Sequence, residues 1–205
     1  MYQCGYTELN NFDFEKHKID YCFTTVDGLK FDIPVPVFHI SLFPDDDEIK
    51  KYRRLLKKET KKFFLGNYYN ENLFISNLDA ATKEEAILKI TEHIRKFYAI
   101  PDDFESFVLE REKYGITSFG TGVALPHPKT ICTDRNIVVV AVLNKPVLWG
   151  NDEVRIIILT SLSNNFNEES DEFIETTSEF MMDIEKINYL AEHPDFNIFM
   201  DLLCS

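Results

Sequence analysis

Two long apolar runs, at residues 136–143 and 154–162, constrain the fold more than any other feature of this chain. Both runs consist largely of β-branched residues and lack the alternation of polar and apolar side chains that a half-exposed strand shows. A strand that is apolar on both sides has to be buried on both faces. The sequence therefore predicts an α/β domain in which helices cover a central sheet.

Further elements of this domain are predicted on either side of the two runs. Short strands are expected at residues 73–78 and 118–125, and a turn is expected at 147–150. Residues 82–85 read T-K-E-E, which is a capping box that opens a helix. The apolar residues that come next at helical spacing are Ala86, Ile87, Ile90, Ile94 and Phe97.

Helical patterns also precede and follow the predicted sheet. One helix is expected to begin at Pro101 and end at Gly115, with Phe104, Phe107 and Val108 pointing inward. From residue 168 to the end the pattern favours two or three acid-rich amphipathic helices. His93 borders a core stripe and has no partner at metal-ligand spacing, so we interpret it as structural.

The first part of the chain is organised differently. Short strands are predicted at residues 21–25 and 35–42, and a helix through 50–62 is expected to end at Gly66. The lysines and arginines of 50–62 are compatible with a nucleic-acid or membrane patch, or with a solvated helix face that has acidic partners. We favour the solvated face.

Charge and cysteine usage narrow the class of protein. The net charge is −13, from 22 basic and 35 acidic residues, which argues against a general nucleic-acid surface. The four cysteines include no C-x-x-C pair, so we expect a reducing, cytoplasmic environment. No stretch of about 18 uncharged apolar residues occurs, so no membrane partner is expected.

His127 is the candidate functional residue, because its position in the chain is unusually constrained. It lies in the stretch 116–128, where two glycines break the strand pattern and a proline flanks the histidine on each side. Glycine allows backbone angles that a side chain forbids, whereas proline fixes its own φ and biases the preceding residue toward extended conformations. The imidazole is therefore expected at a strand end, in a loop with little freedom.

Other kinds of site lack their motifs. The sequence contains no G-x-x-x-x-G-K-[ST], G-x-G-x-x-G or G-x-S-x-G, and its five histidines show no metal-ligand spacing. A lone imidazole can instead act as an acid, a base or a phosphoryl acceptor. Arg111 is the candidate hydrogen-bond donor to a phosphate, and the hydroxyls of Thr117, Ser118 and Thr121 are candidates to orient the ring or the phosphate. These residues alone leave open whether His127 is functional or a structural loop histidine.

The same residues carry a resemblance to a known family. The chain resembles the mannitol/fructose-type enzyme IIA domain of the bacterial sugar phosphotransferase system, and the resemblance runs from about residue 73 to about 203. Its motif consists of Arg111-Glu112-Lys113, Thr117, Gly120, Gly122, Ala124 and Pro126-His127, followed by Val147-x-Trp149-Gly150.

The resemblance implies a mixed β-sheet covered by helices and a site for phosphoryl transfer. His127 matches the histidine that takes phosphoryl from the histidine phosphocarrier protein, and Arg111 matches the phosphate-neutralising arginine. Thr117, Ser118, Gly120 and Thr121 would support the phosphate pocket. An enzyme IIB is the further partner implied, and no dissociable cofactor or metal is expected beyond the covalent phosphohistidine.

One position departs from the family pattern. Many members carry a second active-site histidine in an N-E-H-[IL] context, whereas residues 171–174 here read D-E-F-I. We therefore expect Phe173 to stand at the second-histidine position, which puts onward transfer of phosphoryl in question. If the alignment is shifted by a residue, Phe173 is instead an ordinary core aromatic.

The resemblance also suggests a domain organisation. Residues 1–66 are similar to the later strands of an enzyme IIB-like domain with a C-terminal helix, and residues 67–205 form the enzyme IIA-like domain. This order is typical of sugar-operon transcriptional regulators of the antiterminator/activator type. We therefore expect a regulatory phosphoacceptor domain within a longer regulator chain, with no direct nucleic-acid binding by this part. The alternative is a transport enzyme IIA that passes phosphoryl to an enzyme IIB.

Overall fold

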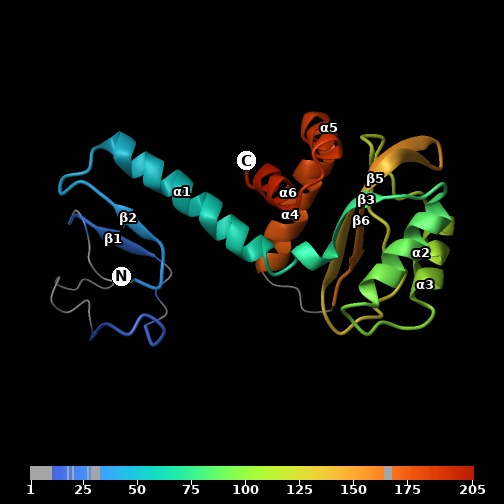
Figure 1. Ribbon diagram of the computed structural model, residues 1–205, viewed down its shortest axis with the longest axis horizontal. Helices are drawn as coiled ribbons and strands as arrows, with labels where there is room; N and C mark the ends of the chain where they lie inside the picture. Colours follow the sequence, from blue (N-terminus) through green and yellow to red (C-terminus); the bar gives the residue numbers. More distant parts are fainter. Residues whose placement is uncertain (1–10, 18, 20, 27, 29–32, 164–167) are drawn as a thin grey trace. The chain divides into compact units, whose positions relative to one another are not determined.

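The computed structural model describes residues 1–205 except 1–10, 18, 20, 27, 29–32 and 164–167, so Cys4 lies outside the described residues. The chain divides into two compact units, residues 1–56 and 57–205 (Figure 1). The division falls within helix α1, Asp46–Leu65. The reason is packing, because Leu65 is fully buried in the core of the second unit, where Lys61 pairs with Glu179.

The first unit contains a pair of short parallel strands. β1, Cys22–Thr24, pairs with β2, Val37–His39, so both predicted strands exist but are shorter than expected. Tyr52, from the part of α1 that belongs to this unit, places its ring 5.6 Å from that of Phe23 and 6.1 Å from that of Phe38. Aromatic contacts thus hold the helix to the two strands.

The second unit is built on a mixed four-stranded sheet, as the resemblance predicted. The strand order is β3-β5-β6-β4. β3 and β4 run parallel to their neighbours, whereas β5 and β6 form a long antiparallel pair. The bounds are β3 Phe74–Leu78, β4 Val123–Ala124, β5 Ile137–Trp149 and β6 Asp152–Ser161.

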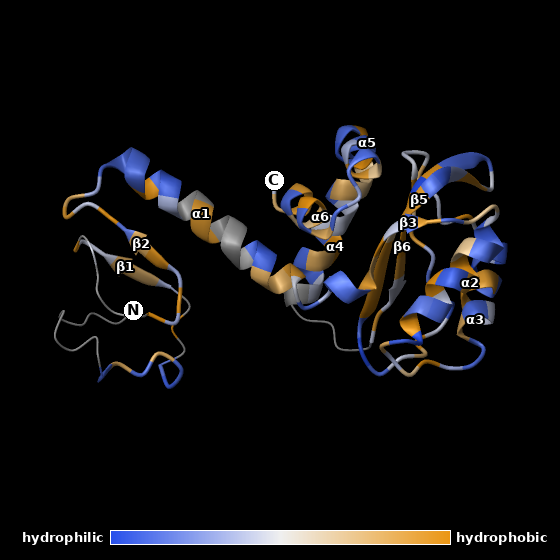
Figure 2. Ribbon diagram, viewed as in Figure 1, coloured by the Kyte–Doolittle hydropathy of each residue, from blue (hydrophilic) through white to orange (hydrophobic). Residues whose placement is uncertain are grey.

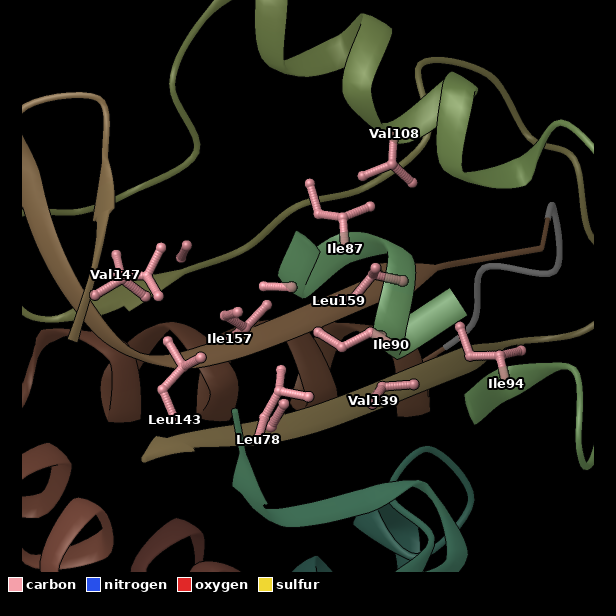
Figure 3. Close-up of a cluster of buried hydrophobic side chains, with 14 of the residues drawn as sticks. Leu78, Ile87, Ile90, Ile94, Val108, Val139, Leu143, Val147, Ile157 and Leu159 are labelled. Carbon is pink, nitrogen blue, oxygen red and sulfur yellow. The ribbon is translucent and has the colours of Figure 1, made fainter. Parts of the chain in front are cut away.

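The two apolar runs are buried on both faces, as the sequence indicated. Alternate residues of β5 and β6 belong to different cores: Val139 and Ile157 to one, Val140 and Ile158 to the other. Helices α2, Lys83–Ile94, and α3, Phe104–Tyr114, contribute to the first core, part of which is drawn in Figure 3. Helices α4, Glu168–Met182, α5, Ile184–Glu192, and α6, Phe196–Leu203, contribute to the second. Figure 2 shows hydrophobic residues along the central strands and mixed faces on the helices.

The start of α2 follows its sequence signal. The Thr82 side chain accepts a hydrogen bond from the Glu85 backbone N–H at 3.1 Å, and the Glu85 carboxylate accepts from the Ala81 N–H at 2.9 Å. His93 is structural, as interpreted, since its Nε2 lies 2.7 Å from the Asn72 carbonyl. The prediction for Phe97 was wrong: it lies beyond the end of the helix and is 47% exposed.

The expectation of a turn at residues 147–150 was also wrong in part. Residues 147–149 do not turn the chain but continue β5, with Val147 opposite Val154, and the turn comes only at Gly150, whose φ is 69°. The register shifts between Val142 and Val147, at a segment containing Pro146, which has no N–H to offer a ladder.

The predicted strand at 118–125 is mostly a turn. Only Val123 and Ala124 form β4, because Gly120 and Gly122 adopt φ values of 72° and 96° and reverse the chain. The reversal is closed by hydrogen bonds from the Phe119 N–H to the Val123 carbonyl and from the Leu125 N–H to the Thr117 carbonyl. In the described residues no helix is long and apolar enough to cross a bilayer.

Candidate phosphoryl-acceptor site

His127 lies just after β4, in a segment held against the sheet. The prolines on both sides of it are buried, and the Pro126 carbonyl accepts a hydrogen bond from the Thr160 N–H of β6 at 3.0 Å. The imidazole itself is partly buried. The expectation of a constrained histidine at a strand end therefore matches the local structure.

Both ring nitrogens of His127 have defined partners. Nδ1 lies 3.0 Å from the Leu125 carbonyl oxygen, and Nε2 lies 3.2 Å from Nε of Arg111. A carbonyl can only accept a hydrogen bond and a guanidinium can only donate one. The network therefore assigns the proton to Nδ1 and a lone pair to Nε2. Nε2 is thus the nucleophilic atom of this ring.

Arg111 comes from the last turn of α3 and is held at two points. Besides the bond to His127, its Nη1 donates to the Gly115 carbonyl at 3.0 Å. A guanidinium fixed in this way presents a rigid fork of N–H donors next to Nε2. Such donors stabilise the negative charge of a phosphoryl group.

The three hydroxyl groups expected to support the pocket are engaged with the protein in this structure. Thr117 donates to Glu112, Ser118 donates to Asp152 at 2.6 Å, and Thr121 donates to the Met181 carbonyl at 2.6 Å. Their contacts hold the 117–123 turn in place. Gly120 lies exposed within that turn, where its positive φ serves the chain reversal.

Glu112 and Asp152 were not singled out as site residues by the sequence analysis. Glu112 is a buried carboxylate next to Arg111, and Asp152 accepts the Ser118 hydroxyl from the start of β6. The signal for Glu112 was its place in the R-E pair of the motif. Asp152 has no comparable signal, because its role depends on how β6 lies beside the turn.

Phe173 is 3% exposed and belongs to the core beneath α4. Its ring stacks on Tyr68 with centroids 4.3 Å apart and 12° between the planes. The neighbouring Tyr69 donates its hydroxyl to Thr177 at 2.6 Å, since Thr177 gives its own proton to the Phe173 carbonyl. Burial raises the pKa of Tyr69 well above its ordinary value, so this donor is retained in alkaline solution.

Phe173 also lines a small apolar cavity of about 80 Å³ together with Leu125. Leu125 is the residue whose carbonyl holds the His127 ring. The structure thus brings Phe173 to the side of the loop that positions the histidine. At this place an aromatic ring fills space and offers no hydrogen-bond donor.

We expect the substitution Phe173→Leu to lower the free energy of unfolding of the second unit by about 1–2 kcal/mol, because the stack on Tyr68 is lost and the cavity enlarges. Guanidinium unfolding followed by fluorescence of Trp149, the single tryptophan, reports on this unit. The matched control is Phe97→Leu at an exposed position, where the change should stay within about 0.5 kcal/mol. Equal effects of the two substitutions would contradict a specific role of the stack.

In the described residues no cluster of three or more His, Cys, Asp or Glu side chains is placed to hold a metal ion. What the fold and this site define is an α/β domain with a positioned imidazole next to an arginine.

Residues 67–205 match the family model described as phosphoenolpyruvate-dependent sugar phosphotransferase system, EIIA 2. The match covers more than half of the chain. The chain therefore belongs to this family, and the resemblance noted from the sequence is confirmed.

Curated relatives include transcriptional regulators from Bacillus subtilis. The probable licABCH operon regulator is 27% identical over 154 residues, which cover 75% of this chain and 23% of that protein. The transcriptional regulator ManR is 20% identical over 188 residues, covering 89% of this chain and 28% of that protein. The chain thus spans about a quarter of the length of these relatives.

The fold is also similar to solved structures. One is the complex of enzyme IIA and phosphorylated enzyme IIB for mannitol from Escherichia coli, matched at 26% identity and a TM-score of 0.56. The match covers 66% of this chain and 96% of that one. The mixed sheet with helices on both faces is therefore the fold of mannitol-type enzyme IIA domains.

Proposed function

We propose that His127 accepts a phosphoryl group at Nε2 from the histidine phosphocarrier protein, and that this covalent state controls a sugar-responsive transcriptional regulator. One observation carries the proposal: the ring is held with Nδ1 protonated against Leu125 while Nε2 faces Arg111 at 3.2 Å. A nucleophile with its lone pair beside a fixed cation is the arrangement that phosphoryl transfer requires. Membership of the EIIA 2 family supports the same reaction.

In the proposed step the bond between phosphorus and the donor imidazole breaks while a bond between phosphorus and Nε2 of His127 forms. The donor histidine recovers its lone pair, and His127 keeps its proton on Nδ1. The positive charge that develops on the His127 ring is stabilised by the Leu125 carbonyl. Arg111 turns its N–H donors from Nε2 to the phosphoryl oxygens, so the charge of the group is met as it arrives.

The regulatory role is supported by the relatives and by the charge that the modification adds. A phosphoryl group brings about −1.5 to −2 charges to one loop at neutral pH. Such a local change can shift the packing equilibrium of a larger chain. The match to ManR extends beyond residues 67–205 on the N-terminal side. This extension supports the proposal that residues 1–66 are an enzyme IIB-like segment of the same kind of regulator.

The test is to incubate the protein with labelled phosphoenolpyruvate, enzyme I and the phosphocarrier, and to locate the label by peptide mapping. We expect stoichiometric label on the peptide that contains His127, stable in alkali and labile in acid as phosphohistidine is. Omission of the phosphocarrier should prevent labelling. Label on a different peptide, or none at all, would refute the assignment of His127 as the acceptor.

A transport role is the second candidate, because one of the similar solved structures is a complex of an enzyme IIA with a phosphorylated enzyme IIB. In that case phosphoryl would pass from His127 to an enzyme IIB, again without a dissociable cofactor. The distinguishing assay mixes the labelled protein with purified enzyme IIB candidates. Rapid transfer to one of them favours transport, whereas retention of the label favours regulation.

A further inference from the structure

Glu112 is a buried acid to which the proposed reaction assigns no task. It is 6% exposed, on α3, one residue after Arg111. Its Oε2 accepts a hydrogen bond from the indole Nε1 of Trp149 at 2.8 Å and lies 3.7 Å from Nζ of Lys83. Its Oε1 accepts the hydroxyl of Thr117. A carboxylate in such a place is costly unless it is paired, and here both oxygens have donors.

The partners of Glu112 come from three different parts of the second unit. Trp149 ends β5, Lys83 begins α2, and Thr117 opens the turn before His127. The side chain therefore ties the last turn of α3 to the sheet and to the turn at once. Residues 111 and 112 lie about 100° apart around a helix axis, so Glu112 can face the core while Arg111 faces the histidine.

Two groups hold the His127 ring, and Glu112 is connected to both. One is the Arg111 guanidinium, which donates to Nε2 and belongs to the neighbouring residue on the helix. The other is the Leu125 carbonyl, which accepts from Nδ1. Leu125 is itself fixed by the hydrogen bond from its N–H to the Thr117 carbonyl at 3.0 Å. The Thr117 hydroxyl in turn donates a hydrogen bond to the Glu112 carboxylate.

We infer that Glu112 is a positioning residue for phosphoryl acceptance: it sets the Arg111 guanidinium and the Leu125 carbonyl at the spacing that keeps Nε2 of His127 unprotonated and aligned. The inference rests on the proposed function of His127. Glu112 does not touch the phosphoryl group and acts only through the two groups that hold the ring. Misplacement of a reacting group by about 1 Å can cost a factor of about a hundred in rate.

Three substitutions separate positioning from bulk stability. Glu112→Gln keeps the shape, because the amide oxygen can accept from Trp149 while the amide nitrogen donates to the Thr117 hydroxyl. Glu112→Leu removes both links. Thr117→Val is close to isosteric and removes only the link to the turn, so it remains informative if Glu112→Leu does not fold. Glu105→Gln, at the other end of α3, where Glu105 pairs with Arg95, is the matched control.

The first measurement is the tautomer of His127, read from long-range nitrogen–proton NMR correlations of the imidazole on folded, unphosphorylated protein. We expect the wild type, Glu112→Gln and Glu105→Gln to carry the proton on Nδ1. Thr117→Val and Glu112→Leu should show a mixture of both tautomers. Phosphorylation by the phosphocarrier should slow by roughly 10–100-fold in these two variants and by less than about threefold in Glu112→Gln.

The outcomes are distinct. A Thr117→Val protein with the wild-type tautomer and rate overturns the inference, and so does a slowed variant whose ring signals remain those of the wild type. If the wild type accepts no phosphoryl group, the proposed function fails, yet the NMR signals still decide whether Glu112 positions the ring. A melting curve for each variant identifies the folded ones.

Discussion

Replacement of His127 by alanine is expected to abolish phosphorylation by the phosphocarrier. The substitution removes Nε2, the ring nitrogen that carries the lone pair and lies 3.2 Å from Nε of Arg111. In the structure Thr117, Ser118 and Thr121 give their protons to Glu112, Asp152 and the Met181 carbonyl. Hydroxyls used in this way are poor substitutes for an imidazole, since they would have to leave their partners and lose a proton.

The measurement is incorporation of label from phosphoenolpyruvate in the presence of enzyme I and the phosphocarrier. His193→Ala serves as the matched control, because His193 is exposed after α5, and its label should equal that of the wild type. His127→Gln tests shape separately, since it restores polar atoms but no nucleophile. Label that persists unchanged in His127→Ala would exclude His127 as the acceptor.

Replacement of Arg111 by lysine is expected to slow phosphoryl acceptance by about a hundredfold, a loss typical of removing one fixed donor from a site of developing charge. Arginine here binds the Gly115 carbonyl and the His127 ring at the same time. An ammonium group is a point charge on a flexible stem and cannot keep both contacts. The positive charge is conserved, so the effect measures geometry and not net charge.

Rapid-quench kinetics over a range of phosphocarrier concentrations should show that the maximal rate of phosphorylation falls. The phosphocarrier concentration that gives half of the maximal rate should change little. Arg95→Lys is the matched control, since Arg95 binds backbone carbonyls and Glu105 at the other end of α3. It should leave the rate unchanged. Equal rates for Arg111→Lys and the wild type would remove Arg111 from the mechanism.

Phe173 is a buried residue of the second core. The residue lies against Tyr68 and lines the same cavity as Leu125. A ring packed in this way is placed as an ordinary core aromatic is, which is the second of the two interpretations that the sequence allowed for Phe173.

Much of the fold was predictable because it depends on local patterns. The β-branched runs indicated a sheet buried on both faces, and Val139 and Val140 do face opposite cores. The capping box at Thr82 began α2 as expected. Signals of this kind reflect the period of a single element and its first hydrogen bonds, so they can be read without knowledge of the rest of the chain.

The wrong predictions share a different origin. Residues 118–125 have the composition of a strand, yet they form a turn because two glycines take positive φ values. Residues 147–149 resemble a turn, yet they pair with β6 because the hairpin continues past a register shift. In both places the outcome depends on which backbone groups find partners elsewhere, and composition does not specify these partners.

The sequence by itself determined the class of fold and the family, and it singled out His127 and Arg111 as the pair to examine. Only the tertiary structure decided that Arg111 reaches Nε2 across 16 residues, and that Glu112 meets Trp149 across 37. It also showed that the hydroxyls of Thr117, Ser118 and Thr121 donate hydrogen bonds to other groups of the protein. The physical reason is that hydrogen bonds between distant residues depend on strand register and on the path of the loop, which are set by packing of the whole domain.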